Sequence, residues 1–297
     1  MRNIKTAGII YFTGTGGTEQ AAKAIEVELR NRGIETLIKE ISVNDETKYS
    51  AADMLFFLYP VHAGDASEAV YNYIRSLPNM PIPLTDCVIL SVSAGGEVLF
   101  NTACRSKVKR KLNKKGFKPI YEDMIMMPNN FAMSFTDEES SLMLYALPYK
   151  VKKIIERVMS GEVRKTTPKI FDSVLRTIIE PFKLFAKING RCLKANDKCT
   201  GCGLCAEKCP RGNIKIQKNK PIFDWKCVMC MRCVYLCPVN AIKNTFTKAI
   251  TLKSGFDINK YKDLSEKITD FSEESITRAT KDNKALHKYL LEILKTI

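Results

Sequence analysis

The stretch Cys199-Thr-Gly-Cys202-Gly-Leu-Cys205-Ala-Glu-Lys-Cys209-Pro210 recurs 28 residues later as Cys227-Val-Met-Cys230-Met-Arg-Cys233-Val-Tyr-Leu-Cys237-Pro238. Both runs read C-x2-C-x2-C-x3-C-P, and together they hold eight of the 11 cysteines. Outside the runs, Lys198 and Ile214 recur at the same offset as Lys226 and Ile242. This part of the chain is therefore an internal repeat organised around cysteine.

The spacing within each run is typical of iron–sulfur ligands. Three thiolates three residues apart can wrap one tight loop around a cubic cluster, and the fourth ligand must come from elsewhere. Where this spacing occurs twice, the fourth cysteine of each run ligates the other cluster. The repeat therefore predicts two [4Fe-4S] clusters. The first would take Cys199, Cys202, Cys205 and Cys237, and the second would take Cys227, Cys230, Cys233 and Cys209.

Two other uses of cysteine fit the pattern less well. Structural zinc sites favour two separated C-x2-C pairs over three consecutive ligands. Disulfide frameworks belong to small secreted domains, and this chain has 297 residues and no secretory signal region before residues 8–12. We therefore expect a cytoplasmic protein in a reducing compartment.

The composition restricts the partners. The chain has 47 basic and 32 acidic residues and a net charge of +15. Two clusters with their thiolates would add about −4, which leaves a basic protein. Such a surface suits an acidic redox protein or, as a less favoured reading, an anionic membrane surface. No nucleic-acid-binding motif accompanies the charge, so we expect no nucleic-acid partner.

The N-terminus has the pattern of a phosphate site. An apolar strand over 4–12 runs into Thr13-Gly14-Thr15-Gly16-Gly17-Thr18, and an amphipathic helix follows over 19–29. Backbone amides, hydroxyl groups and the helix dipole can together bind a phosphate there. A P-loop is excluded because the segment lacks the Gly-Lys-Ser/Thr ending. A dinucleotide loop is excluded because Glu19 stands where the third glycine belongs.

Downstream, strands and helices alternate. Residues 33–41, 53–59, 87–92 and 118–126 are predicted strands, and 66–77, 98–115 and 145–159 are predicted helices. The pattern predicts an α/β fold with a doubly wound five-stranded parallel sheet, whose ligand lies at the carboxyl ends of the strands. Three loops rich in small residues are expected there: 13–18, 60–65 and 93–96.

The phosphate loop Thr13-x-Thr15-Gly16-x-Thr18, with Gly95-Gly96 after the fourth strand and the cysteine runs beyond, resembles the flavodoxin–ferredoxin fusion family over about residues 1–245. The resemblance implies a flavodoxin-like domain over 1–160, a helical linker over 161–194, a small α+β ferredoxin-like two-cluster domain over 195–246 and a helical tail over 247–297. It also implies FMN as a cofactor. Its phosphate would bind to Thr13, Gly14, Thr15, Gly16, Gly17 and Thr18, and its ring would lie near Tyr59, Pro60, Val61, His62, Ala63, Gly64, Ser93, Ala94, Gly95, Gly96 and Asn101.

One departure bears on the flavin. Flavodoxins commonly hold the ring between a tryptophan and a tyrosine, whereas the single tryptophan here, Trp225, lies in the cysteine-rich domain. Tyr59 and His62 are the remaining ring candidates. The alternative to bound FMN is a flavodoxin-like fold that has lost its flavin.

Two further segments carry patterns. The linker has apolar residues at helical spacing from Phe171 to Phe185, interrupted at Pro181, and we expect this stripe to pack one domain against the other. The segment 128–148 reads as an insertion that covers the flavin edge, and 284–297 as a terminal helix.

These features predict an electron-transfer iron–sulfur flavoprotein that couples one-electron ferredoxin-type partners to a flavin. No side chain is predicted to act as acid, base or nucleophile. A flavin-dependent reductase of a small molecule, with the clusters as an internal wire, is the main alternative. A cluster-binding sensor that does not turn over is a third.

Overall fold

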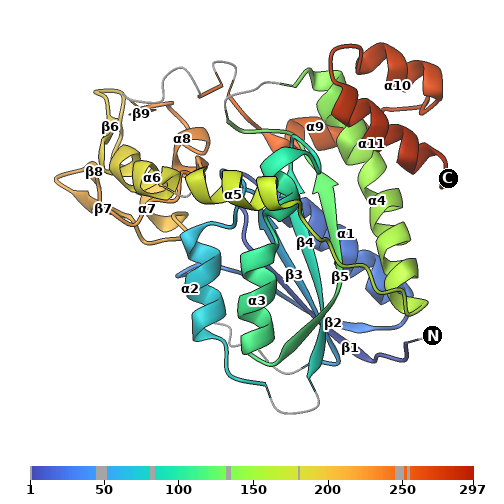
Figure 1. The fold of residues 1–297 in the computed structure, drawn as a ribbon. Helices are drawn as coiled ribbons and strands as arrows, with labels where there is room; N and C mark the ends of the chain where they lie inside the picture. The colour runs from blue at the N-terminus through green and yellow to red at the C-terminus, as the bar shows by residue number, and fades with distance from the viewer. Residues whose placement is uncertain are drawn as a thin grey trace.

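The computed structural model describes residues 2–44, 52–80, 84–131, 135–179, 181–244, 251–252 and 255–297. A large α/β domain forms one part of the molecule, and a small cysteine-rich domain lies beside one edge of it (Figure 1). None of the described helices is long and apolar enough to cross a membrane.

The large domain is built on a parallel sheet. Its five strands are β1 (Thr6–Tyr11), β2 (Glu35–Glu40), β3 (Met54–Pro60), β4 (Thr85–Ser93) and β5 (Phe117–Met126), in the order β2-β1-β3-β4-β5. All neighbouring strands are parallel. This order is that of the flavodoxin-like doubly wound fold, so the predicted fold class is confirmed.

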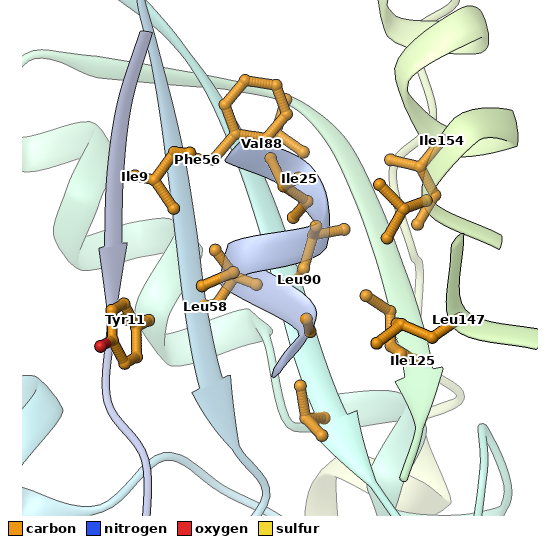
Figure 2. Close-up of a cluster of buried hydrophobic side chains, with 14 of the residues drawn as sticks. Ile9, Tyr11, Ile25, Phe56, Leu58, Val88, Leu90, Ile125, Leu147 and Ile154 are labelled. Atoms are coloured by element: carbon orange, nitrogen blue, oxygen red, sulfur yellow. The ribbon is translucent and has the colours of Figure 1, made fainter. Parts of the chain in front are cut away.

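Helices cover both faces of the sheet. The helices α1 (Gly17–Asn31) and α4 (Asp137–Met159) pack on one face, and α2 (Glu68–Ser76) and α3 (Ser106–Lys114) pack on the other. Alternate residues of each strand enter the two cores because side chains alternate along a strand. Figure 2 shows Ile9, Phe56 and Leu90 facing the α1/α4 side together with Ile25 and Ile154. Both faces are buried, which explains why β3 is apolar throughout.

Two predicted helices have different boundaries in the structure. The segment expected to be helical over 98–115 contains a short 3-10 helix, η1 (Leu99–Ala103), followed by α3. The last helix of the domain begins at Asp137, well before the predicted residue 145, and Pro148 lies inside it. Thr136 and Glu139 form a capping box at this start. Most of the predicted 128–148 insertion is therefore the first part of α4.

The cysteine-rich domain repeats its backbone as well as its sequence. It contains β6 (Leu193–Ala195), α7 (Leu204–Glu207), β7 (Ile214–Gln217), β8 (Lys220–Phe223), α8 (Arg232–Tyr235) and β9 (Ile242–Asn244). Antiparallel pairs form between β6 and β9 and between β7 and β8. The helices α7 and α8 occupy equivalent places in the two runs, as do β7 and β9. The domain is thus a small α+β unit with two matching halves.

The linker forms two helices that behave differently. It comprises α5 (Ile170–Ile179) and α6 (Phe182–Arg191), which meet at Pro181 as predicted. Phe171 and Ile178 of α5 are both 68% exposed, so the prediction that the whole stripe packs between the domains is wrong for this helix. Asp172 holds the other face of α5 to the large domain by accepting a hydrogen bond from the Thr102 hydroxyl at 2.8 Å.

The C-terminal tail packs on the large domain. It consists of α9 (Ile258–Ser265), α10 (Glu273–Ala279) and α11 (Lys284–Leu294). Leu286, Leu290 and Ile293 of α11 are buried against Met143 and Ala146 of α4. The predicted terminal helix is present, and the tail extends the core of the large domain (Figure 1).

We expect Leu290→Ala to lower the free energy of unfolding by about 2–4 kcal/mol, because it leaves a cavity under α11. Ile297→Ala, which shortens a side chain that is 62% exposed, is the control and should change it by less than about 0.5 kcal/mol. Denaturant unfolding of the large domain measures both. Equal effects of the two variants would show that α11 contributes little to the core.

Candidate functional site

The eight cysteines of the two runs line two separate cavities. One cavity is lined by Cys199, Cys202, Cys205 and Cys237, and we call it the outer cysteine cavity. The other is lined by Cys209, Cys227, Cys230 and Cys233, and we call it the inner cysteine cavity. Each cavity therefore combines three cysteines of one run with the fourth cysteine of the other. In the described residues no three His, Cys, Asp or Glu side chains converge closely enough to hold a single metal ion.

The two cysteine loops share an unusual backbone. In and just after the first run, left-handed conformations occur at Gly201, Gly203 and Gly212. The equivalent positions of the second half, Met229, Met231 and Asn240, have the same conformation. Glycine adopts this conformation freely, whereas other L-residues lose about 1–2 kcal/mol in it. The second loop thus places methionine side chains where the first has none, and Met231 is buried in the small domain's core.

The surroundings of the sulfurs suit thiolates bound to iron. Backbone amides of Met229, Asn213 and Ala241 donate to the sulfurs of Cys227, Cys209 and Cys237 at 3.4, 3.3 and 3.2 Å. Such bonds help to set the potential of a cluster. Burial raises the pKa of Cys227 to about 12. A thiolate at this position therefore needs nearby positive charge such as that of iron.

The predicted phosphate loop encloses a cavity of about 90 Å³ at the start of α1. Thr13, Gly14, Thr15, Gly17 and Thr18 line it, together with Asn129 and Asn130. The Thr13 hydroxyl accepts a hydrogen bond from the Gly16 amide at 3.1 Å, which holds the loop in its turn. The first amides of a helix have no partner within the helix, so the cavity offers donors and a positive dipole to a phosphate.

A larger cavity of about 530 Å³ adjoins the phosphate cavity. Both are lined by Val61, His62, Ser93 and Ala94, so the two cavities are direct neighbours. Ala63, Gly64, Gly95 and Asn101 also line the larger one, which brings together the loops predicted to hold a flavin ring. Its volume is typical of a small-molecule site. We call it the ring cavity.

Four predicted residues lie elsewhere. Tyr59 is fully buried in the core beneath α2 and α3, where its hydroxyl donates to the Cys104 carbonyl at 3.3 Å. The prediction that Tyr59 contacts the flavin ring is therefore wrong. Gly16 caps α1 at φ 100°, and a Cβ there would meet Ile258 of the tail at 2.7 Å. Gly96, in the loop 93–96 after β4, has the left-handed conformation with φ 70°. Its carbonyl accepts a hydrogen bond from the Asn101 side chain at 3.1 Å. Pro60 lines the phosphate cavity, not the ring cavity.

His62 is a neutral side chain of the ring cavity. Its pKa is lowered to about 4, mainly by burial; the hydrogen bond with the backbone of Val228 partly opposes this shift, and the charge of Lys183 contributes to it. His62 packs edge-to-face on Phe12, with the ring centroids 6.3 Å apart. At pH 7 it can therefore offer a hydrogen bond but no charge.

Several lining residues are not among the predicted site residues, although three of them lie in the segment 128–148 that was expected to cover the flavin edge. Asn129, Asn130 and Phe131 follow β5 directly, at the same edge of the sheet as the three predicted loops. The predicted end of the fifth strand could have indicated them. Lys183 and Ala186 come from the linker helix α6. Cys227, Val228 and Met229 come from the small domain, so its second cysteine loop forms a wall of the ring cavity.

The same cysteine loop is bound directly to the phosphate loop. The Arg232 guanidinium donates to the carbonyls of Thr13 and Gly14 at 2.7 and 2.8 Å and pairs with Glu40 at 2.5 Å. A Cβ on Gly14 would lie 2.5 Å from the Cys230 carbonyl oxygen. Only a glycine at this position permits so close an approach.

Comparison with known proteins assigns the small domain. Residues 198–241 match the family described as a 4Fe-4S dicluster domain. The chain joins a flavodoxin-like domain to a 4Fe-4S dicluster domain. No curated protein matches the chain.

Solved structures similar to the large domain include flavodoxins. A short-chain flavodoxin associated with a PDU bacterial microcompartment is 17% identical, and the match covers 51% of this chain and 97% of that one with a TM-score of 0.38. A Streptococcus pneumoniae TIGR4 flavodoxin is 14% identical over 51% of this chain and 99% of its own, with a TM-score of 0.37. A Fusobacterium nucleatum flavodoxin mutant bound to flavin mononucleotide is 17% identical, and the match covers 54% and 98% of the two chains with a TM-score of 0.38. The fold assignment itself depends on the strand order.

We expect Gly14→Ala to destabilise the junction of the two domains by about 1–3 kcal/mol, because the new methyl group overlaps the Cys230 carbonyl. Gly17→Ala in the same loop is the matched control, since its Cβ would make an ordinary 3.5 Å contact with Met127. Limited proteolysis between the domains, compared for the two variants, measures the effect. Equal protection in both variants would contradict the close contact at Gly14.

Proposed function

We propose that the protein is an electron-transfer flavoprotein that carries electrons between two [4Fe-4S] clusters and FMN. One observation carries the proposal: Cys227, Val228 and Met229 line both the inner cysteine cavity and the ring cavity. A cluster and a flavin bound in these cavities would be separated by a single loop. When bound, the clusters supply single electrons and the flavin one or two.

The chain's own residues have defined parts in this proposal. Thr13–Thr18 would bind the FMN phosphate, while the loops 61–64 and 93–95, with Asn101, would border the ring. Asn101 donates a hydrogen bond to the Ser93 hydroxyl at 3.2 Å, which stabilises the loop 93–96. Phe131 and Met229 offer the apolar surface that flavodoxins obtain from tryptophan and tyrosine. Neutral His62 would place no charge beside the ring.

The donor or acceptor in this proposal is an acidic one-electron redox protein, which the net charge of +15 would attract. We place the protein in the cytoplasm, where eight thiols committed to iron remain reduced.

The first test is the flavin and iron content of protein purified without oxygen. We expect about one FMN and about eight iron atoms per chain. Thr15→Val combined with Thr18→Val should weaken FMN binding by about tenfold or more, because it removes two hydroxyl partners of the phosphate. Iron content should stay unchanged.

Thr167→Val combined with Thr269→Val is the matched control, because both threonines are exposed and neither lines the phosphate or the ring cavity. It should leave FMN affinity unchanged. A protein that takes up no FMN even from excess cofactor would overturn the flavoprotein proposal. Parallel loss of flavin and iron in the Thr15/Thr18 variant would mean that the domain had unfolded.

A second prediction tests the crossed ligation. Cys209→Ala should remove the cluster of the inner cavity, leaving about four iron atoms per chain. The double variant Cys209→Ala with Cys230→Ala should lose no more iron than either single variant, because both cysteines would serve one cluster. Cys192→Ser should retain the full iron content, since Cys192 lines neither cysteine cavity. Loss of nearly all iron in the double variant would refute the crossing.

A flavin-dependent reductase of a small molecule is the second candidate. It is favoured by the ring cavity's extension beyond the flavodoxin loops to Asn129, Asn130 and Phe131, which leaves room for a substrate under the segment that follows β5. Multiple turnovers with a small acceptor, unaffected by added acidic redox protein, would support the reductase over the carrier.

A further inference from the structure

The two cysteine cavities lie at different places relative to the ring cavity. The inner cavity shares Cys227, Val228 and Met229 with it. The outer cavity shares no lining residue with the ring cavity among the residues described by the structure. The backbone of α6 packs directly on the same cysteine loop at Gly190, where an added Cβ would overlap the side chain of Cys227. The two clusters are therefore not equivalent with respect to a flavin.

The outer cavity contains the most exposed of the eight predicted ligands. Cys202 is the single exposed cysteine among the 11, whereas Cys209 of the inner cavity is buried. Gly201 and Gly203 flank Cys202, so its two neighbours in the sequence have no side chain that could cover its sulfur. A cluster bound there would approach the solvent more closely than one bound in the inner cavity.

Basic side chains surround this exposed cysteine loop. Lys198 immediately precedes Cys199. The turn of the β7–β8 hairpin, with Lys218 and Asn219 both in the left-handed conformation, folds over Gly201, whose Cβ would lie 2.8 Å from the Asn219 carbonyl oxygen. The Lys220 ammonium donates to the Asn196 carbonyl at 3.2 Å, the same carbonyl that accepts from the Cys199 amide at 3.1 Å. All three lysines are exposed, and we call them the lysine collar.

The charge balance of the domain favours an acidic partner. Residues 195–246 contain nine basic and three acidic side chains. One of the acids, Glu207, is already paired with Lys208 at 2.7 Å. Leu236, which is exposed, immediately precedes Cys237 of the outer cavity and adds an apolar side chain to this surface. An apolar centre with a charged rim is the usual composition of a protein docking site.

We propose that the outer cluster is the electron port of the protein and that the lysine collar docks an acidic one-electron redox protein there, while the inner cluster relays electrons to the flavin. This inference rests on the proposed function. In each transfer the partner is oxidised by one electron and the outer cluster is reduced by one. The electron then passes to the inner cluster, and two such transfers reduce FMN fully, with protons from water.

The other concentrated basic surface is α3 and the start of β5. Arg110, Lys114 and Lys118 are exposed there. None of these residues lines a cysteine cavity or the ring cavity. A partner bound at α3 would have no cysteine loop beneath it. The two surfaces therefore provide a matched comparison of equal charge.

The test is binding of an oxidised, acidic bacterial-type ferredoxin to the holoprotein, measured by calorimetry at low and high salt. Changing Lys198, Lys218 and Lys220 to Glu should weaken binding by about tenfold or more at low salt and reduce the salt dependence. Changing Arg110, Lys114 and Lys118 to Glu alters the net charge equally and should change the affinity by less than about threefold. Flavin and iron are counted in every variant. Normal cofactor content with unchanged binding would contradict the docking site alone, whereas missing flavin would contradict the flavoprotein proposal.

Equal weakening by both triple variants would show that only net charge matters and would overturn the port. So would weakening by the α3 variant alone, or no binding to the wild-type protein. Zero-length carbodiimide cross-linking of the two proteins gives an independent check that needs no variant. Cross-links at the lysine collar would support the port, and cross-links confined to α3 would contradict it.

The order of the clusters has its own test. When Cys230→Ala holoprotein is mixed with reduced ferredoxin, the remaining outer cluster should become reduced, which EPR detects. The flavin should stay oxidised, as measured by its absorbance. In Cys202→Ala, reduction of the remaining inner cluster should slow by about tenfold or more, because the port is missing. The reverse pattern would overturn the assigned order. Iron content confirms that each variant keeps its other cluster.

Discussion

The attachment of the second cysteine loop to the phosphate loop determines the geometry of everything else in the site. Arg232, between Cys230 and Cys233, donates to two phosphate-loop carbonyls and pairs with Glu40, and its side chain is largely buried. Hydrogen bonds from a charged group are worth about 1.5–3 kcal/mol each. Because these bonds reach backbone atoms, they fix the position of the loop independently of any side-chain rotamer on the flavodoxin side. The inner cysteine cavity is thereby held against the ring cavity.

Other elements enclose the same junction from different sides. The linker helix α6 contacts Cys227 through Gly190, and its Lys183 pairs with Asp65 of the large domain at 2.5 Å. Ile258 of the C-terminal tail covers Gly16 at the start of α1. Asn130 donates to the Thr15 hydroxyl at 2.9 Å and to the Cys230 carbonyl at 3.3 Å, which connects both loops to the end of β5. Segments far apart in sequence therefore stabilise one arrangement of the two cavities.

Local patterns were sufficient to predict the five parallel strands and the cysteine sets, because these depend on spacing within short stretches. The resemblance to flavodoxins added the loops 61–64 and 93–95, which form part of the ring cavity. Tyr59 was misplaced because β3 is buried on both faces, so its apolar sequence does not indicate which way a side chain points. The start of α4 carries a readable signal in the capping box of Thr136 and Glu139, whereas Pro148 inside the helix indicates a later start. The Arg232 contact joins residues more than two hundred positions apart. No local pattern predicts such a contact, and the exposed stripe of α5 likewise reflects tertiary packing.

The crossing of the cysteine sets has a consequence for symmetry. Each cavity takes three cysteines from one half of the small domain and one from the other, and the halves match in sequence offset, in short helices and in left-handed positions. Neither half can complete a set of four alone, but two copies of one half could complete each other about a twofold axis, as in an isologous dimer. The domain is thus a pseudo-dimer within a single chain. The two halves nevertheless differ in their loops: the first has Gly201 and Gly203, whereas the second has Met229 at the ring cavity and Met231 in the core of the small domain.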